Sequence, residues 1–287
     1  MNNLTDIGYI KELLGRHNFS FSKGLGQNFL VNPSVCPRIA EMGGAGKGVG
    51  VIEVGTGIGV LTKELALRAD KVVAVEIDER LLPVLEETLS EFDNIKIINE
   101  DIMKVDLKKL IEEEFEGMDV AVCANLPYYI TSPVIMYFLE SGARVNSLTV
   151  MVQKEAADRL CADVGTRQSG AISVAVNYYG TANTLFKVSR GSFVPSPNVD
   201  SAVIRIDVDR KYSLSAEDEK FFFTVVKSAF SQRRKTLANS LSSMMGVSKD
   251  QVYAALSECG LGENTRMEQL DMEKLISFAG LLKQKIQ

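Results

Sequence analysis

The sequence predicts a doubly wound α/β domain with a mainly parallel sheet, followed by a small all-α domain. Strand-like apolar runs alternate with helical segments as far as Val152, and this order is typical of a parallel sheet covered by helices. Two later strand-like segments, 184–188 and 202–208, have no long helix between them and therefore predict an antiparallel edge. From Ser215 onward no strand pattern remains.

A polar segment near residue 210 marks the predicted domain boundary. We assign residues 1–209 to the α/β domain, with a helical N-terminal segment over residues 1–47, and residues 210–287 to the helical domain. The length supports this division, because single hydrophobic cores rarely grow beyond about 250 to 300 residues.

The composition is that of an ordinary globular protein, with 46% hydrophobic and 24% charged residues. No apolar stretch approaches the ~20 residues that a membrane span needs, and the first residues do not form a secretory signal. The four cysteines and the single histidine, His17, show no metal-ligand spacing. We therefore expect a cytoplasmic protein without metal or disulfides. The net charge of −5 argues against indiscriminate nucleic-acid binding but leaves room for a local RNA-binding patch.

The N-terminal segment begins with a predicted amphipathic helix over residues 4–16. A stretch with two glycines, 22–30, follows, and glycines allow a backbone to approach a ligand closely. Taken alone, this stretch favours the plainer interpretation, a surface loop between two helices.

The first buried strand, predicted over 48–54, runs into a glycine-rich turn that opens a helix ending near Arg68. Glycines at Gly55 and Gly57 allow a tight turn and let a nucleoside lie against the backbone beside the helix N-terminus. This pattern alone is weak, since dinucleotide-binding folds share it. Its spacing departs from the pyrophosphate-binding fingerprint, and a carboxylate, Glu53, precedes the first glycine.

Acidic residues follow the next two strands. The strand predicted over 71–75 ends at Glu76, which lies 21 residues after Gly55, the spacing at which a carboxylate accepts hydrogen bonds from ribose hydroxyls. Asp78 is better explained as the cap of the following helix. The strand predicted over 95–98 is followed by Glu100 and Asp101; either could accept the amino hydrogens of a bound adenine.

The fourth strand, predicted over 118–124, delivers the tetrapeptide Asn125-Leu126-Pro127-Tyr128. The Asn125 carboxamide oxygen and the next backbone carbonyl are two acceptors for the hydrogens of an exocyclic amine. Pro127 stiffens the turn, and Tyr128 offers a flat face on which a base stacks. The alternative is an ordinary strand-to-loop turn, which Asn and Pro also favour.

The remaining segments complete the predicted sheet and the helical domain. A helix is predicted over 131–139, a fifth strand over 148–152, and helices past Arg159 and over 171–178. The loop from Phe193 to Ser201 carries two prolines and is either a plain β-connection or a support that holds Phe193 out over a target base. Four helices are predicted in the helical domain, over 216–231, 233–245, 248–259 and 267–283.

The predicted ligand positions follow successive strands, and the carboxyl ends of parallel strands line one crevice. Glu76 suits a ribose, and the glycine turn beside it lacks the spacing that binds a pyrophosphate. This combination fits S-adenosylmethionine better than NAD. The tetrapeptide that starts at Asn125 then implies an amine as methyl acceptor.

These motifs together resemble the small-subunit ribosomal RNA adenine dimethyltransferases, which make N6,N6-dimethyladenosine in bacterial 16S rRNA. The motifs that carry the resemblance are Leu25-Gly26-Gln27-Asn28-Phe29-Leu30, Glu53-Val54-Gly55-Thr56-Gly57-Ile58-Gly59, Glu76-Ile77-Asp78, Glu100-Asp101, Asn125-Leu126-Pro127-Tyr128-Tyr129-Ile130, Gln153-Lys154-Glu155 and the Phe193–Ser201 loop. They span nearly all of the first 205 residues and are specific as a set.

The resemblance implies a Rossmann-like class I S-adenosylmethionine-dependent methyltransferase with a helical RNA-binding or ribosome-binding domain. It implies cofactor contacts from Asn28, Leu30, Gly55, Glu76, Asp101 and Asn125, catalytic roles for Asn125, Leu126, Pro127 and Tyr128, and RNA contacts from Phe193, Arg233, Arg234 and Lys235. Many members carry His in place of Asn28, which matters little if the backbone makes that contact. The expected partner is 16S rRNA in the small ribosomal subunit, and we expect a monomer.

Three alternatives remain at this point. A large-subunit rRNA adenine dimethyltransferase of the antibiotic-resistance type shares the catalytic motif, although the helical tail favours the small subunit. A non-catalytic ribosome-assembly protein would keep the fold, but the intact Asn125, Tyr128 and Glu76 argue against loss of catalysis. A dehydrogenase would need a proton-transfer set that the sequence does not show.

Overall fold

The computed structural model describes residues 4–19 and 28–286, which form two compact units. The sheet unit comprises the described residues up to Ala157 together with Ala182–Val208. The helical unit comprises Asp158–Thr181 and the residues from Asp209 onward. The segment 158–181 therefore belongs with the helices, whereas the predicted division placed it in the α/β domain.

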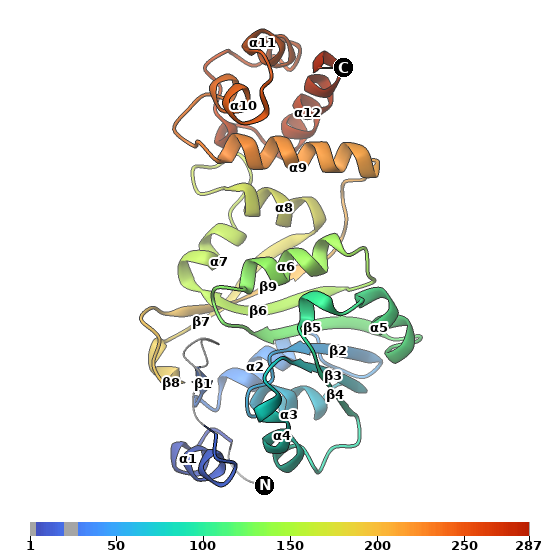
Figure 1. Ribbon diagram of the computed structural model, residues 1–287, viewed down its shortest axis with the longest axis vertical. Coiled ribbons are helices and arrows are strands. Elements are labelled where there is room, and N and C mark those ends of the chain that lie inside the picture. Colours follow the sequence, from blue (N-terminus) through green and yellow to red (C-terminus); the bar gives the residue numbers. More distant parts are fainter. Residues whose placement is uncertain (1–3, 20–27, 287) are drawn as a thin grey trace. The chain divides into compact units, whose positions relative to one another are not determined.

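Seven strands of the described chain form one sheet in the order β4-β3-β2-β5-β6-β9-β7 (Figure 1). The first five of these strands pair in parallel, and β9 runs antiparallel to β6. The mainly parallel sheet with an antiparallel edge region is thus confirmed. The strands are β2 (Val49–Val54), β3 (Lys71–Glu76), β4 (Ile95–Asn99), β5 (Asp119–Asn125), β6 (Ser147–Gln153), β7 (Thr181–Val188) and β9 (Ser201–Asp207).

Helices connect the parallel strands and pack on both faces of the sheet (Figure 1). Short polar side chains cap several of them: the Asp6 carboxylate accepts a hydrogen bond from Tyr9 N, and Asp106 accepts from Lys108 N and Lys109 N. The helices are α1 (Ile7–Arg16), α2 (Val35–Met42), α3 (Val60–Ala66), α4 (Leu82–Thr88), α5 (Leu107–Glu114) and α6 (Thr131–Glu140), with 3-10 turns η2 (Glu79–Leu81), η3 (Ile102–Lys104) and η4 (Arg190–Ser192). Helix α7 (Lys154–Leu160) runs from the sheet unit into the helical unit.

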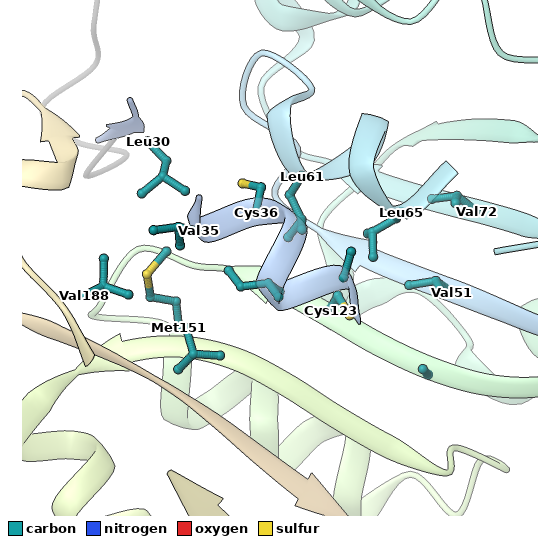
Figure 2. Close-up of a cluster of buried hydrophobic side chains, with 14 of the residues drawn as sticks. Leu30, Val35, Cys36, Val51, Leu61, Leu65, Val72, Cys123, Met151 and Val188 are labelled. Atoms are coloured by element: carbon teal, nitrogen blue, oxygen red, sulfur yellow. The ribbon is translucent and has the colours of Figure 1, made fainter. Parts of the chain in front are cut away.

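The core of the sheet unit shows how the two faces of β2 are covered. On one face, Val51 packs with side chains of α2 and α3, among them Cys36 and Leu65 (Figure 2). Gly50 points to the opposite face because side chains alternate along a strand. There the Phe115 ring, which directly follows α5, lies where a Cβ on Gly50 would meet it at 2.1 Å. Both faces of β2 are therefore closely packed.

A second, two-stranded sheet joins the N-terminal segment to the loop before β9. Strand β1 (Phe29–Leu30) pairs antiparallel with β8 (Phe193–Val194), so that Leu30 lies opposite Phe193. The Val31 N–H adds a hydrogen bond to the Ser192 carbonyl oxygen at 2.8 Å. Segments more than 160 residues apart in the sequence are thus fixed side by side.

The helical unit is built from α8 (Ala171–Tyr179), α9 (Ala216–Phe230), α10 (Leu237–Met245), α11 (Lys249–Glu258) and α12 (Met272–Ile286), with the turn η5 (Met267–Gln269). Helix α8 joins it through aromatic contacts: the Tyr178 ring stacks on Phe222, and Tyr179 stacks on Phe223. The Glu219 carboxylate accepts hydrogen bonds from both tyrosine hydroxyls, at 3.0 and 2.8 Å. These contacts explain why the segment 158–181 groups with the helices. In the described chain no helix combines the length and apolar character that a membrane crossing requires.

Candidate active site

One pocket of the sheet unit, with a volume of about 290 Å³, opens at the carboxyl ends of β2, β3 and β5. The sheet order reverses around β2, whose neighbours are β3 and β5, and such a switch point is where α/β sheets bind ligands. The predicted residues that line this pocket are Asn28, Leu30, Gly55, Glu76, Asp101, Asn125, Leu126, Pro127, Tyr128 and Phe193. The structure therefore brings together every predicted residue except the basic cluster at 233–235.

The glycine turn is tied to the end of β3. Gly55 and Gly57 have φ angles of +75° and +55°, a region that other residues rarely adopt. The Gly55 N–H donates to the Val75 carbonyl oxygen at 2.9 Å. A Cβ on Gly57 would also come within 3.3 Å of the Phe29 ring, so this glycine brings β1 against the turn.

The Glu76 side chain is buried and holds the glycine turn in place. Its Oε2 accepts hydrogen bonds from the Thr56 N–H and the Thr56 hydroxyl, both at 2.9 Å, and from the Gly57 N–H at 3.3 Å. Its Oε1 accepts from the Asp78 N–H at 2.9 Å. A carboxylate oxygen has two lone pairs, so Oε1 retains one acceptor position outside this network, and Glu76 lines the pocket.

The acids after β4 differ in burial, although both line the pocket. Asp101 is half-buried and caps η3, since its Oδ1 accepts from the Met103 N–H at 3.0 Å. Glu100 is exposed, and its Oε1 accepts from the Asp101 N–H. Asp78 caps η2 through the Arg80 N–H, as predicted. Each acid keeps a second carboxylate oxygen beyond these hydrogen bonds, and Asp101 is the more buried of the two.

The tetrapeptide begins at the last residue of β5, where Asn125 pairs with Met151 of β6. The Pro127 carbonyl oxygen accepts from the Ile130 N–H and the Thr131 hydroxyl, which fixes the turn at the start of α6. Among the described residues, neither the Asn125 carboxamide nor the Leu126 carbonyl oxygen has a hydrogen-bond partner. Two acceptors are therefore left for a bound group.

Phe193 is a wall of the pocket and not an exposed aromatic at its mouth. Its side chain is 4% exposed and packs in the core cluster beside Leu30, its partner across the two-stranded sheet. The interpretation in which the proline-rich loop holds Phe193 out over a base is therefore wrong for this structure. Pairing of β8 with β1 turns the ring inward, and so short a strand pair leaves no recognisable pattern in the sequence.

Several lining residues were not foreseen as part of the site. Ile77, Met103 and Tyr129 line the pocket and are 57%, 42% and 62% exposed, so they give it an apolar, accessible part. Ile77 and Tyr129 belong to motifs that the sequence singled out, and Met103 carries no such signal. Among the described residues, no group of three or more His, Cys, Asp or Glu side chains is arranged to hold a metal ion.

The basic cluster at 233–235 lies in the helical unit, and its first residue differs from the other two in its side-chain contacts. The Arg233 guanidinium donates to the carbonyl oxygens of Arg167 and Ser169, at 2.8 and 2.9 Å, and so fastens the segment before α8. Arg234 and Lys235 are exposed, and their side chains have no partner among the described residues. The predicted helix over 233–245 begins only at Leu237, because the Thr236 hydroxyl caps it through the Asn239 N–H.

Comparison with known proteins identifies the family. A family model described as ribosomal RNA adenine dimethylase matches residues 18–284. The chain belongs to the ribosomal RNA adenine dimethylase family. It is 47% identical over 277 residues to the ribosomal RNA small subunit methyltransferase A of Alkaliphilus oremlandii, covering 96% of each chain. It is 43% identical over 286 residues to the protein of that name from Clostridioides difficile, covering 100% of this chain and 99% of the relative.

Solved structures agree with the fold. The dimethylase fold matches a dimethyladenosine transferase from Plasmodium falciparum with a TM-score of 0.74 and 24% identity, over 90% of this chain and 98% of the other. It matches the 23S rRNA methyltransferase ErmE with a TM-score of 0.67 and 28% identity, over 89% and 99% of the two chains. The Rossmann-like methyltransferase fold expected from the sequence is thereby confirmed.

Proposed function

We propose that this rRNA adenine dimethyltransferase transfers methyl groups from S-adenosylmethionine to N6 of adenines in small-subunit 16S rRNA, twice at each base. The observation that carries the proposal is that residues suited to bind a nucleoside and residues suited to bind an amine line the same pocket. The names of relatives that are 43 to 47% identical over nearly the full length favour the small subunit over the large one. The enzyme would act in the cytoplasm, where ribosomal subunits assemble, and as a monomer.

The pocket fits the cofactor on features of its own residues. The free acceptor position of Glu76 Oε1 suits a ribose hydroxyl, and Asp101 suits the adenine amino group. The glycine turn leaves the backbone open beside them, and the backbone at Asn28 and Leu30 would close the site from the N-terminal side. When bound, S-adenosylmethionine supplies an activated methyl group on a sulfonium that leaves without protonation.

The residues at the end of β5 would prepare the acceptor amine. Adenine N6 is a poor nucleophile because its lone pair is delocalised into the ring. The Asn125 carboxamide oxygen and the Leu126 carbonyl oxygen would accept its two hydrogens and favour a tetrahedral nitrogen. No strong base is needed, since positioning supplies most of the acceleration in an in-line transfer, and the proton that N6 loses after each methylation passes to solvent. Pro127 keeps this turn in one geometry through its fixed φ.

The target base must leave its stack to enter the pocket. Tyr128 is the residue we assign to stacking on it, and Phe193 forms the adjoining wall. Arg234 and Lys235 are assigned to RNA phosphates because their side chains are exposed, whereas Arg233 has a structural role that competes with such contacts.

The test uses labelled S-adenosylmethionine with ribosomal subunits from cells that lack this modification. Small subunits, large subunits and naked rRNA are incubated separately with the enzyme, and nucleosides are separated after digestion. Labelled N6,N6-dimethyladenosine confined to the small-subunit sample is expected. Label in large-subunit RNA would contradict the choice of substrate, and no label despite cofactor binding would contradict catalysis.

A further inference from the structure

Two consecutive tyrosines line the pocket just after β5, and they differ in their contacts. The Tyr128 side chain is half-buried, and its hydroxyl is hydrogen-bonded to the hydroxyl of Ser201. Tyr129 is 62% exposed, and among the described residues neither its ring nor its hydroxyl has a partner. The fold therefore holds one ring in place and leaves the other open to a ligand.

The two tyrosines are the central residues of one tight turn. The Ile130 N–H closes this turn by donating to the Pro127 carbonyl oxygen at 3.1 Å, and the Thr131 hydroxyl donates to the same oxygen at 3.2 Å. Thr131 is buried and begins α6, and the fixed φ of Pro127 stiffens the other end of the turn. The backbone of Tyr129 is thus already ordered, so binding through its ring costs little further conformational entropy.

The sheet order separates Tyr129 from the other exposed apolar residues of the pocket. Ile77 follows β3, and Met103 lies in η3 after β4, whereas Tyr129 follows β5. In the order β4-β3-β2-β5, the strands before Ile77 and Met103 lie on one side of β2, and the strand before Tyr129 lies on the other. Tyr129 therefore belongs to the side of the pocket that we assign to the acceptor amine.

A base that leaves its stack to reach this pocket leaves its neighbour in the strand with an uncovered face. Proteins that bind unstacked RNA cover such faces with aromatic rings, and each base stacked in this way changes affinity by about 5- to 150-fold. Among the described lining residues, Phe29 and Phe193 are buried and Tyr128 is half-buried. Tyr129 is therefore the aromatic side chain of this lining that a second base can reach.

We propose that Tyr129 stacks on the base next to the target adenine in the RNA strand, while Tyr128 stacks on the target itself. The inference rests on the proposed function, which brings an adenine of a larger RNA into this pocket. The contact is made with the plane of the neighbouring base, and every base has such a plane. Tyr129 is thus a positioning residue: it holds the strand beside the pocket while the tetrapeptide acts on N6.

Steady-state methylation of unmethylated small subunits separates this role from catalysis. Tyr129→Ala should raise the KM for subunits about tenfold and change kcat by less than about twofold, because the contact is remote from the reacting atoms. The Kd of S-adenosylmethionine and the Tm should not change. Tyr129→Phe and Tyr129→Trp keep a flat ring and should retain the wild-type KM. Tyr129→Leu keeps apolar volume without a flat face and should behave as Tyr129→Ala.

The matched control is Leu67→Ala. It removes another exposed apolar side chain of the sheet unit, one that lies outside the described pocket lining. This variant should have the wild-type KM, so that a general loss of exposed apolar surface is distinguished from loss of the Tyr129 ring.

Cross-linking identifies the contacted nucleotide directly. p-Azidophenylalanine in place of Tyr129 keeps an aromatic ring and couples to its nearest partner on irradiation. The complex is formed with unmethylated small subunits and S-adenosylhomocysteine, which has no methyl group to transfer, and reverse transcription maps the coupled nucleotide. We expect coupling at a nucleotide directly next to an adenine that the wild type methylates. The same group in place of Leu67 should not couple there.

The outcomes separate this inference from the proposed function. An unchanged KM for Tyr129→Ala, or coupling only to nucleotides distant from the methylated adenine, would overturn the role of Tyr129 and leave the methyltransferase proposal standing. A higher Kd for S-adenosylmethionine in Tyr129→Ala with an unchanged KM for subunits would also overturn it, since the ring would then serve the cofactor. Absence of methylation by the wild type would overturn both proposals. The cross-linking result decides the question even if Tyr129→Ala does not fold.

Discussion

The Tyr128 hydroxyl lies 2.8 Å from the Ser201 hydroxyl, and this hydrogen bond joins the tetrapeptide after β5 to the first residue of β9. Ser201 is fully buried, so its position is fixed by the sheet. The bond sets the orientation of the Tyr128 ring that lines the pocket. Ser201 closes the proline-containing motif of the sequence, and this contact gives that position a physical role.

We expect Ser201→Ala and Tyr128→Phe to have similar, modest effects, because each removes the same hydrogen bond and keeps the aromatic face. Loss of this hydrogen bond should raise the activation free energy by about 1 kcal/mol, which corresponds to a roughly fivefold lower kcat. Tyr128→Ala, which removes the stacking face, should lower kcat at least 100-fold. Steady-state kinetics on the single variants and on the Ser201→Ala/Tyr128→Phe double variant test this. Fully additive losses in the double variant would contradict a shared contact.

Glu76→Gln should weaken cofactor binding and loosen the glycine turn together. The neutral amide accepts less strongly than a carboxylate, and its NH₂ group cannot accept the Thr56 and Gly57 N–H groups on that side. We expect a 10- to 100-fold higher Kd for S-adenosylmethionine and a lower Tm without ligand. The matched variant Asp101→Asn should raise Kd with little change in Tm, since Asp101 caps only a short turn. Equal Tm values for Glu76→Gln and wild type would contradict the structural part of this role.

The buried Glu53 predicts a particular pH dependence of stability. Its pKa is raised to about 8, from an ordinary value of 4.5, so the folded state binds a proton that the unfolded state has lost between these values. Folding is therefore progressively disfavoured by this group as pH rises through that window, by up to about 1.4 kcal/mol per pH unit. Glu53→Gln removes the dependence.

Denaturant unfolding of wild type and Glu53→Gln at pH 5, 6.5 and 8, without ligand, measures this difference. The variant should gain stability relative to wild type as pH increases. A stability difference that does not change with pH would show that Glu53 is ionised in the folded protein throughout the range.

The basic cluster should separate into one structural residue and two RNA-binding residues. Arg233→Ala removes two charge-assisted hydrogen bonds to backbone carbonyls, and its exposure limits the cost to about 1 kcal/mol of stability. Arg234→Ala and Lys235→Ala should leave Tm unchanged and weaken binding to small subunits, with a smaller salt dependence. Unfolding curves and filter binding at two salt concentrations distinguish the two roles. Loss of stability in Lys235→Ala would contradict the division.

The sequence was sufficient to predict those parts of the fold that a local residue pattern determines. The apolar runs of β2, β3, β4 and β5 define strands, and because parallel strands end at one edge, the residues that follow them can be placed in one pocket from the sequence alone. The predictions that differ from the structure concern features that depend on contacts between distant segments. The two-residue pairing that turns Phe193 inward has no local signal, and neither do the aromatic contacts that bring Tyr178 and its helix to α9. Glu53 is visible in the sequence as a carboxylate before the glycines, but only its burial shows that it lacks a partner.

The central claim is that the tetrapeptide that begins at Asn125, the last residue of β5, orients the acceptor amine while the rest of the pocket holds the cofactor. Single-turnover methyl transfer to unmethylated small subunits, measured with wild type and Asn125→Ala beside the Kd of S-adenosylmethionine on the same preparations, tests it most directly. We predict a loss of at least 100-fold in the transfer rate, about 3 kcal/mol, with Kd changed by less than about threefold. Equal losses in transfer and in cofactor binding would contradict the role assigned to Asn125, and unchanged transfer would contradict the mechanism itself.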